Sequence, residues 1–163
     1  MPAAVRAQVS FKSSRPFRVC TGSEDFAVNF YSGPPFKFTS TAAKHSNFVN
    51  AVAFSPDGTK FLSAASDMFV RLFDGKEGTQ LAEGKVHKGT VYQAVWSPDS
   101  SRILTASADK SIKVLDGTTL EEKHSVDFGK TPLHMAVGCA WAASQLVAYT
   151  LNGTMHIFDA DNP

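Results

Sequence analysis

Short runs of apolar and β-branched residues recur along this chain, and clusters of turn-forming residues separate them. Residues 49–54, 60–66 and 69–73 are three such runs. Ser55-Pro-Asp-Gly58 lies between the first two, and Asp74-Gly75 follows the third. Runs of this length, bounded by Pro, Gly, Asp and Ser, are typical of β-strands joined by tight turns. The pattern therefore predicts an all-β protein.

The same reading places strands along the whole sequence in units of four. The first unit is expected to hold strands at 5–11, 17–22, 27–31 and 36–41, with a turn at Arg15-Pro16. The second has 49–54, 60–66, 69–73 and 79–83, and the third repeats this scheme over 91–126. The fourth has only 135–141, 145–150 and 154–158. Its outer strand is expected to be lacking.

A fixed spacing of 42 residues relates the second unit to the third. It separates five identical pairs: His45 and His87, Pro56 and Pro98, Asp57 and Asp99, Asp67 and Asp109, and Asp74 and Asp116. The repeats are expected at about 4–43, 44–85, 86–127 and 128–161. A period of this size is typical of β-propeller blades. Propellers usually have four to eight blades, so we expect a partial propeller, part of a longer one, whose open blade faces favour self-association.

Composition and charge exclude several classes of function. Sixteen basic residues balance fifteen acidic ones, so no electrostatic footprint for nucleic acid or a membrane surface is present. No apolar run has the length of a signal peptide or a membrane span. Cys20 and Cys139 are too far apart in sequence to suggest a disulfide framework or a zinc site, and we read the compartment as reducing.

The repeated residues resemble those of WD repeats. That family has a His before the inner strand, an Asp between the second and third strands, and a Trp-Asp pair that ends the third. Here the structural positions are filled by His45, Asp67, His87 and Asp109, and Asp25 extends the series. The Trp is replaced in Phe73-Asp74, Leu115-Asp116 and Phe158-Asp159. The hydrogen-bonded tetrad of that family can therefore be only partial.

Longer stretches are similar to the actin-interacting protein 1 family. They are Ser14-Arg-Pro-Phe-Arg-Val, Gly33-Pro-Pro-Phe-Lys-Phe38, His45-Ser-Asn-Phe-Val-Asn50 and Gly153-Thr-Met-His-Ile-Phe158. The resemblance covers nearly the whole chain and implies the last four blades of that family's N-terminal propeller. It implies a cytoplasmic, cytoskeletal protein that binds actin filaments and actin-depolymerising factor or cofilin, and that promotes cofilin-dependent filament disassembly.

Two candidate triads could be imagined as hydrolase sites. They are His45, Asp67 and Ser63, and, one repeat later, His87, Asp109 and Thr105. Catalytic sites are seldom duplicated at every repeat, whereas structural hydrogen bonds are, so we interpret these residues as a tie between a loop and a turn. No phosphate loop, metal-spaced cluster or nucleophile elbow is present. We expect no catalytic, cofactor-binding or metal-binding residue, and no enzyme activity.

Protein binding is the better hypothesis. Glu24 and Phe48 should lie on one face of the propeller, because turns between second and third strands and loops before inner strands emerge together. Lys37 and Phe38 lie on an outer strand. An exposed Phe beside charge is a frequent hot-spot composition, and by resemblance these four residues match the family's surface for filaments and cofilin. The alternatives stay open: the two Phe side chains are core, the two charges are merely solvated, or the chain is a general WD-repeat scaffold without actin activity.

Overall fold

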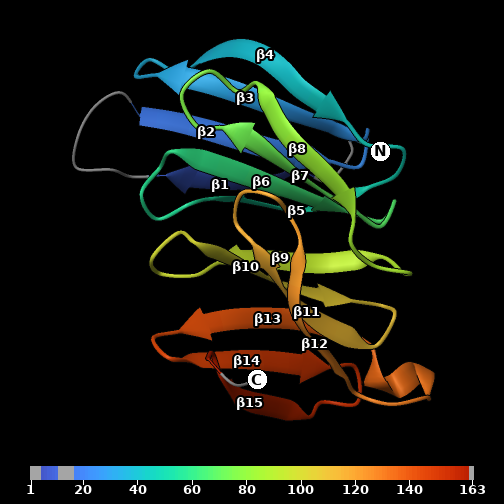
Figure 1. Cartoon of the computed structure of the whole chain (residues 1–163). Helices are drawn as coiled ribbons and strands as arrows, with labels where there is room; N and C mark the ends of the chain where they lie inside the picture. Colours follow the sequence, from blue (N-terminus) through green and yellow to red (C-terminus); the bar gives the residue numbers. More distant parts are fainter. Residues whose placement is uncertain (1–4, 11–16, 162–163) are drawn as a thin grey trace.

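The computed structural model describes residues 5–10 and 17–161, so the expected turn at Arg15-Pro16 and the end of the first strand at Phe11 lie outside the described residues. Four antiparallel sheets stack one upon another in chain order (Figure 1). The strands are β1 (Val5–Ser10), β2 (Phe17–Ser23), β3 (Ala27–Gly33), β4 (Lys37–Lys44), β5 (Val49–Phe54), β6 (Lys60–Ala65), β7 (Phe69–Asp74), β8 (Gln80–Lys85), β9 (Val91–Trp96), β10 (Arg102–Ser107), β11 (Ser111–Asp116), β12 (Glu122–Asp127), β13 (Ala136–Ala142), β14 (Gln145–Thr150) and β15 (Met155–Asp159).

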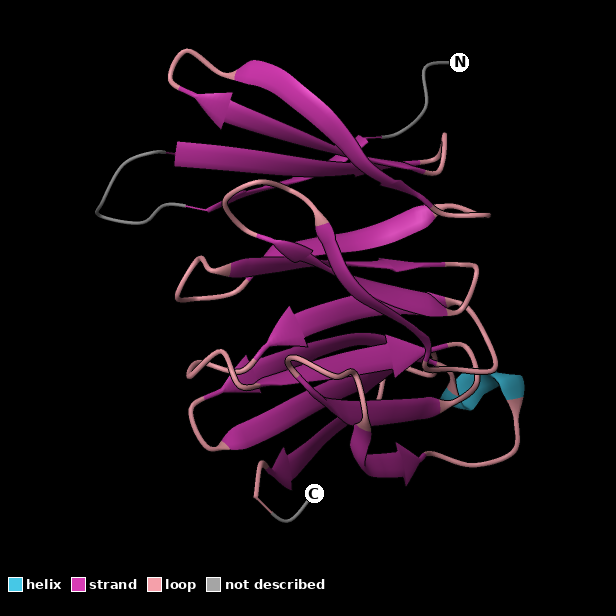
Figure 2. Cartoon of the chain, turned by 45° about the horizontal axis from the view of Figure 1, so that its top comes forward, coloured by secondary structure: helices cyan, strands magenta, loops and turns pink. Residues whose placement is uncertain are grey.

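Each sheet is a meander of consecutive strands. The first three sheets have four strands, β1–β4, β5–β8 and β9–β12, and the last has three, β13–β15. This confirms the prediction of an all-β partial propeller whose last sheet is one strand short. The arrangement is a stack that does not close on itself, with the first and last sheets at opposite ends (Figure 1). A single 3₁₀ turn, Pro132–His134, precedes β13 and is the one helical element in the part of the chain described (Figure 2).

The repeat is preserved in the strand register. Lys60 pairs with Asp74, Arg102 with Asp116, and Gln145 with Asp159. Because side chains alternate between the faces of a strand, equal register puts equivalent residues on equivalent faces of successive sheets.

The core lies between the sheets. Leu62 and Leu72 pack in the interface between the second and third sheets, together with Ile103 and Leu115 of the third. Leu104 and Ile112 face the other way and pack against the last sheet. The middle strands β6 and β10 are therefore buried on both faces, which is why they are almost uninterrupted runs of apolar and small residues.

Aromatic rings fill the interface between the first two sheets. Phe61 stacks on Phe73 with ring centroids 4.7 Å apart and on Phe30 at 5.5 Å. Gly22 is needed beside them, because a Cβ there would lie 2.5 Å from Cγ1 of Val49. Large rings and small residues alternate across the interface so that the sheets can approach closely.

Candidate functional site

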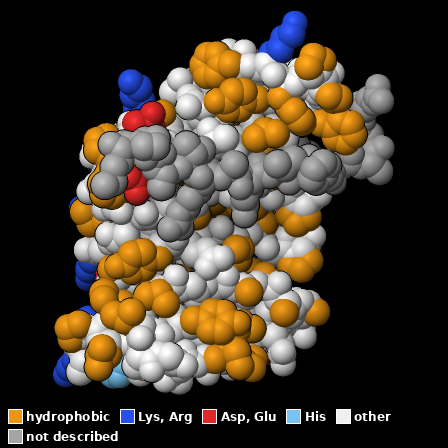
Figure 3. Space-filling view, turned by 180° about the vertical axis from the view of Figure 1, so that it is seen from behind, with side chains coloured by type: hydrophobic (Ala, Val, Ile, Leu, Met, Phe, Trp, Pro, Cys, Tyr) orange, Lys and Arg blue, Asp and Glu red, His pale blue; other side chains and the backbone are white. Residues whose placement is uncertain are grey.

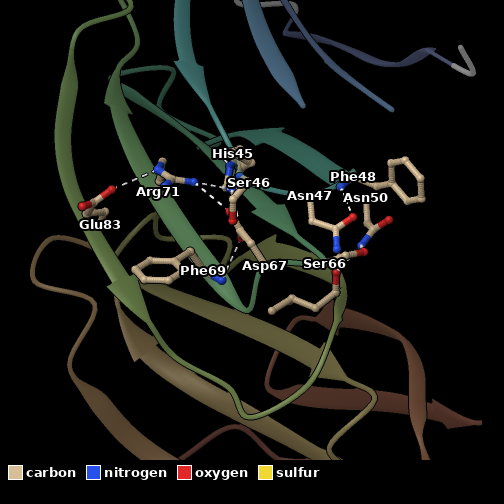
Figure 4. Close-up of polar contacts among 12 residues, drawn as sticks. His45, Ser46, Asn47, Phe48, Asn50, Ser66, Asp67, Phe69, Arg71 and Glu83 are labelled. Carbon is tan, nitrogen blue, oxygen red and sulfur yellow. Dashed lines mark hydrogen bonds and ion pairs between the residues drawn. The ribbon is translucent and has the colours of Figure 1, made fainter. Parts of the chain in front are cut away.

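A buried polar network joins the loop before β5 to the turn between β6 and β7. Asp67 can only accept, so the Nδ1–H of His45 donates to its carboxylate at 2.9 Å, and the Ser63 hydroxyl then donates to Nε2 at 2.7 Å. Asp67 also accepts the backbone N–H groups of Ser46 at 3.0 Å and Phe69 at 3.1 Å. Figure 4 shows His45, Ser46 and Phe69 around the Asp67 carboxylate. The carboxylate thus fixes two segments that are separated by a whole hairpin.

The third sheet contains the same network. His87 donates to Asp109 at 2.9 Å, and Thr105 lies 2.8 Å from Nε2 of His87. The backbone N–H of Lys88 donates to Asp109 at 2.9 Å, as that of Ser46 does to Asp67. The structure therefore brings together both predicted pairs, His45 with Asp67 and His87 with Asp109.

Arg71 is a member of the first network that sequence reasoning missed. Its guanidinium contacts the His45 ring, lies 3.4 Å from the Asp67 carboxylate, and forms an ion pair with Glu83 at 3.0 Å (Figure 4). Its repeat counterpart is Lys113, which pairs with Glu122 at 2.7 Å. The sequence could have revealed this, because Arg71 follows Asp67 by four residues, as Lys113 follows Asp109.

The network shifts the pKa values of its members in favour of a neutral imidazole beside a carboxylate. Burial lowers the pKa of His45, and the positive charge of Arg71 lowers it further; together they outweigh the attraction of Asp67. Burial alone would raise the pKa of Asp67, but the hydrogen bonds from Ser46, His45 and Phe69 bring it below its ordinary value. The pKa of Asp109 is lowered in the same way, by His87, Lys88 and Ser111 against the effect of burial.

The order Ser63–His45–Asp67 is that of a serine hydrolase triad, but the hydroxyl is inaccessible. Ser63 and Thr105 are fully buried, and His45 and His87 are almost so. A nucleophile must meet a substrate carbonyl at about 3 Å beside donors for the oxyanion, and here the sheets pack over both hydroxyls. The geometry supports a structural tie.

Glu24 and Phe48 come from adjoining segments at one edge of the stack. Glu24 is an exposed residue of the turn between β2 and β3. That turn meets the loop before β5, since the N–H of His45 donates to the carbonyl of Phe26 at 2.8 Å. The side chain of Phe48 is 47% exposed, which excludes the alternative of a core residue. It contacts the ring of Phe26 with centroids 5.7 Å apart.

Phe26 is a second residue that the sequence reasoning did not single out. Phe26 follows Asp25, just as Met68 follows Asp67 and Lys110 follows Asp109. The three residues after these Asp residues all have left-handed backbone angles, with φ of 73°, 74° and 73°. Each of these residues is exposed or partly exposed in the turn between the second and third strands of its sheet. The repeat spacing could have revealed this series.

Lys37 and Phe38 lie at the other end of the first sheet. Lys37 pairs with Ser32 and Phe38 with Tyr31, whereas Ala27, next to the turn that contains Glu24, pairs with Lys44. The two ends of this hairpin are five residues apart along β3, about 17 Å at the usual rise. Phe38 is 59% exposed, so it is also outside the core, and its ring meets that of Tyr31 at 5.8 Å. The four predicted binding residues thus form two separate pairs.

Metal and thiol chemistry find no support in the described residues. No group of three or more His, Cys, Asp or Glu side chains there could hold a metal ion. Cys20 and Cys139 are both free and buried. Burial raises the pKa of Cys20 to about 12 and that of Cys139 further still, which suppresses the reactive thiolate.

Comparison with known proteins agrees with the repeat seen in the strands. The WD domain, G-beta repeat family matches residues 36–74 and 78–116. Each match begins at an outer strand, β4 or β8, and continues through the first three strands of the next sheet. Two of the chain's repeats thus match the WD-repeat family. The WD repeats therefore link successive sheets, because each contributes strands to two of them.

The relatives confirm the more specific resemblance. WD repeat-containing protein 1 from Mus musculus is 40% identical over 158 residues, and the alignment covers 95% of this chain and 26% of that protein. Actin-interacting protein 1-2 from Arabidopsis thaliana is 45% identical over 162 residues, covering 94% of this chain and 27% of that protein. The WD-repeat chain thus spans about a quarter of the length of these relatives. Among the described residues, no helix is both long and apolar enough to cross a membrane.

Proposed function

We propose that this WD-repeat chain is a non-enzymatic module that binds actin filaments together with cofilin or actin-depolymerising factor, and that it promotes cofilin-dependent disassembly. The observation that carries the proposal is the 45% identity, over nearly the whole chain, to a protein named Actin-interacting protein 1-2. This function places the chain in the cytoplasm, on the cytoskeleton.

The mechanism is recognition, not chemical conversion. A binding protein shifts an equilibrium between filament states only by binding one state more tightly than the other. If the chain contacts actin and cofilin at once, it favours the strained, cofilin-bound filament and its severed products. Neither buried triad has an exposed nucleophile, so the proposed activity needs no catalytic step.

Two exposed pairs are the candidate contact residues. Phe48, with its neighbour Phe26, forms an exposed aromatic pair next to the acidic turn of Glu24. Phe38 is exposed beside Lys37 at the other end of the hairpin. Aromatic side chains flanked by charge supply large contact area at low entropic cost. Their separation suits two contacts on one composite target, with filament subunit and cofilin each meeting one pair.

A general protein-binding scaffold without actin activity is the second candidate. The WD-repeat match over residues 36–116 favours it, because that match alone specifies a scaffold and no partner. This candidate predicts that the exposed aromatic pairs contribute nothing to filament binding. The two candidates therefore differ in a measurable way.

Co-sedimentation with actin filaments, with and without cofilin, tests the proposal. The wild-type chain should pellet with cofilin-decorated filaments and remain in the supernatant with bare ones. Phe48→Ala and Phe38→Ala should each weaken pelleting at least tenfold, the effect of a hot-spot side chain. Leu81→Ala is the matched control, because Leu81 is also exposed, at 53%, but belongs to β8 of the second sheet and to neither pair.

Each outcome has a clear meaning. Cofilin-dependent pelleting that Phe48→Ala or Phe38→Ala removes and Leu81→Ala preserves supports the actin module. Folded protein that never pellets contradicts it and leaves the general scaffold. Pelleting that none of the three variants changes supports actin binding but rejects these residues as the contact sites.

A further inference from the structure

The turn between β14 and β15 has the backbone conformation of the corresponding turn in the other sheets. Gly153 has a φ of 84°, close to the 74° of Met68 in the second sheet. Each of these two residues donates its N–H to the carbonyl three residues earlier, at 2.9 and 3.2 Å respectively. Asn152, which precedes Gly153, therefore holds the position that Asp67 holds before Met68. The last sheet thus has an amide where the repeat has a carboxylate.

The side-chain carbonyl of Asn152 is polarised by two donors. Its Oδ1 accepts the hydroxyl hydrogen of Thr150 at 2.6 Å and the backbone N–H of Thr154 at 3.0 Å. Thr150 is only 3% exposed, and its contact with Oδ1 is shorter than the 3.1 Å to the carbonyl of Thr154. The Nδ2 amino group, by contrast, has no hydrogen-bond partner within the described part of the chain. The amide carbon is therefore activated toward attack, and its amino group is free to leave.

Gly153 leaves the path to this carbon open. A Cβ at Gly153 would meet no heavy atom within 4 Å, so the space around the residue is empty. The other three turns have a side chain at the same position, on Phe26, Met68 and Lys110. Glycine adds neither bulk nor conformational restraint when its nitrogen moves toward the side chain before it. Asn152-Gly153 is the one Asn-Gly pair in the sequence.

We propose that Asn152 modifies itself in the folded protein by cyclisation onto Gly153. Hydroxide removes the proton from the Gly153 N–H, and the nitrogen attacks Cγ of Asn152. The N–Cγ bond forms, the Cγ–Nδ2 bond breaks, and Nδ2 takes a proton from water and leaves as ammonia. Water then opens the cyclic imide to aspartate, or to isoaspartate, in which the main chain runs through the side-chain carbonyl.

Residues of the turn stabilise the charge that this attack creates. As the nitrogen bonds to Cγ, negative charge develops on Oδ1, to which the Thr150 hydroxyl and the Thr154 N–H already donate. Fixed donors aimed at a developing oxyanion lower the barrier to reaction. The Gly153 N–H must first leave the carbonyl of Thr150. The reaction therefore needs one hydrogen bond of the turn to open while the two donors stay in place.

The turn is open whether or not another sheet follows. Asp25 of the first sheet and Asp109 of the third each have a sheet after them, and they remain exposed or partly exposed. The turn of Asn152 is held from within its own sheet, because the N–H of Asn152 donates to the carbonyl of Leu133, in the loop before β13, at 2.9 Å. Access of hydroxide and water to Asn152 is therefore a property of the turn itself.

Both products put a new carboxylate into the turn. Aspartate at position 152 restores the residue type of the repeat and accepts the same two hydrogen bonds, so it should leave the hairpin intact. Isoaspartate lengthens the main chain by one carbon and so disturbs the pairing of β14 with β15. Leu151 and Met155, close by in sequence, are 51% and 55% exposed, and Figure 3 shows hydrophobic side chains at the surface toward both ends of the stack. The modification adds a negative charge beside such apolar residues.

Incubation in water labelled with oxygen-18, followed by peptide mapping by mass spectrometry, tests the proposal. At pH 8 the native wild-type chain should convert Asn152 to aspartate and isoaspartate that carry the label, and the rate should rise with pH. Asn47 is the internal control, because it is exposed but precedes Phe48, whose N–H is held by Oδ1 of Asn47 at 2.8 Å. Asn47 should stay intact over the same period.

Three variants separate the parts of the mechanism. Removal of an oxyanion donor costs roughly 10²–10³ in an enzyme, and in this open turn Thr150→Val should slow the conversion about tenfold. Thr150→Ser, which copies Ser107 of the third sheet, keeps the hydroxyl and should keep the rate. Gly153→Met copies the turn of the second sheet and should slow the conversion more than Thr150→Val does. In urea, Thr150→Val and the wild type should react alike, because the donors are no longer fixed.

Labelled Asn152, intact Asn47 and a slower Thr150→Val variant, all in native buffer, support the proposal. Native Asn152 that stays intact while the urea-unfolded chain reacts there overturns it, and so does an Asn47 that reacts as fast. A Thr150→Val variant that is folded by circular dichroism and reacts as fast as the wild type overturns the role of the turn donors. If Thr150→Val does not fold, a Gly153→Met variant as fast as the wild type overturns the proposal. No actin is involved, so the result is independent of the proposed function.

Discussion

The Nδ1 atom of His45 lies 2.9 Å from the carboxylate of Asp67, although 22 residues separate them in sequence. The same atom of His87 lies 2.9 Å from Asp109 across the same interval. In each case the histidine ends one connection between sheets and the aspartate begins a hairpin turn. The repeated contact therefore fixes the position of one sheet's entry loop relative to that sheet's central turn.

Asp67→Asn should destabilise the fold. The substitution keeps the size of the side chain but turns one acceptor oxygen into a donor, opposite the N–H groups of Ser46, Phe69 and His45. We expect the free energy of unfolding to fall by about 1–3 kcal/mol, the usual consequence of unsatisfied buried groups. Urea denaturation at fixed protein concentration measures it.

The control for that experiment is Asp161→Asn. Asp161 has a side chain that is 81% exposed and forms an ion pair with Arg102 at the surface, so its substitution should change the free energy of unfolding by no more than about 0.5 kcal/mol. Equal effects of the two variants would show that the buried network contributes nothing special to stability.

Stability should fall in two stages as the solution is acidified. The pKa of His45 is lowered in the folded state, so the unfolded chain takes up a proton there first, from about pH 6.5 downward. The pKa values of Asp67 and Asp109 are also lowered, so their contribution is full above about pH 4 and is lost as the pH falls through their folded values.

The first stage can be assigned by substitution. In His45→Asn the decline in unfolding free energy between pH 6.5 and 5 should become shallower, while the decline below pH 4 should remain. Urea denaturation at a series of pH values gives both slopes. A variant whose slope between pH 6.5 and 5 equals that of the wild type would show that another group causes the first stage.

The two cysteines should be inert in the folded protein. Burial raises the pKa of Cys20 to about 12 and that of Cys139 further, and the thiolate is the reactive form. A chromogenic disulfide reagent at pH 8 should therefore label neither thiol in native buffer and both in urea. Rapid labelling of native protein would mean that one of these interfaces between sheets opens readily.

Much of the fold could be predicted because the repeated residues are ones that form turns, and a turn depends mainly on the residues within it. Ser55-Pro-Asp-Gly58 specifies a turn, Asp67 and Asp109 mark the next turn, and the spacing between them sets the strand lengths. Equal spacing then implies equal register, which the pairing of Lys60 with Asp74 and of Arg102 with Asp116 confirms. The three-stranded last sheet follows from the same count.

The candidate site was less predictable because it depends on the direction of the strands and on the exposure of individual side chains. Glu24 precedes β3, and Lys37 follows the turn at the far end of β3, where the antiparallel strand β4 begins. The two residues are close in sequence but lie at opposite ends of the sheet. Whether Phe38 and Phe48 are core or surface could not be decided from residue type, because Phe61 and Phe73, of the same type, are fully buried. Only the packing of the sheets separates the two classes.

Phe61→Ala should be among the most destabilising single substitutions in the chain. Phe61 is fully buried, and its ring lies between those of Phe30 and Phe73, so truncation leaves a cavity that two stiff sheets cannot close. The expected loss in the free energy of unfolding is about 3–5 kcal/mol. Phe38→Ala removes the same atoms from a ring that is 59% exposed and should cost no more than about 0.5 kcal/mol. Urea denaturation of both variants and of the wild type, under the same conditions, measures the two losses. A loss below about 1 kcal/mol in Phe61→Ala would mean that the first two sheets are held together by something other than this aromatic stack.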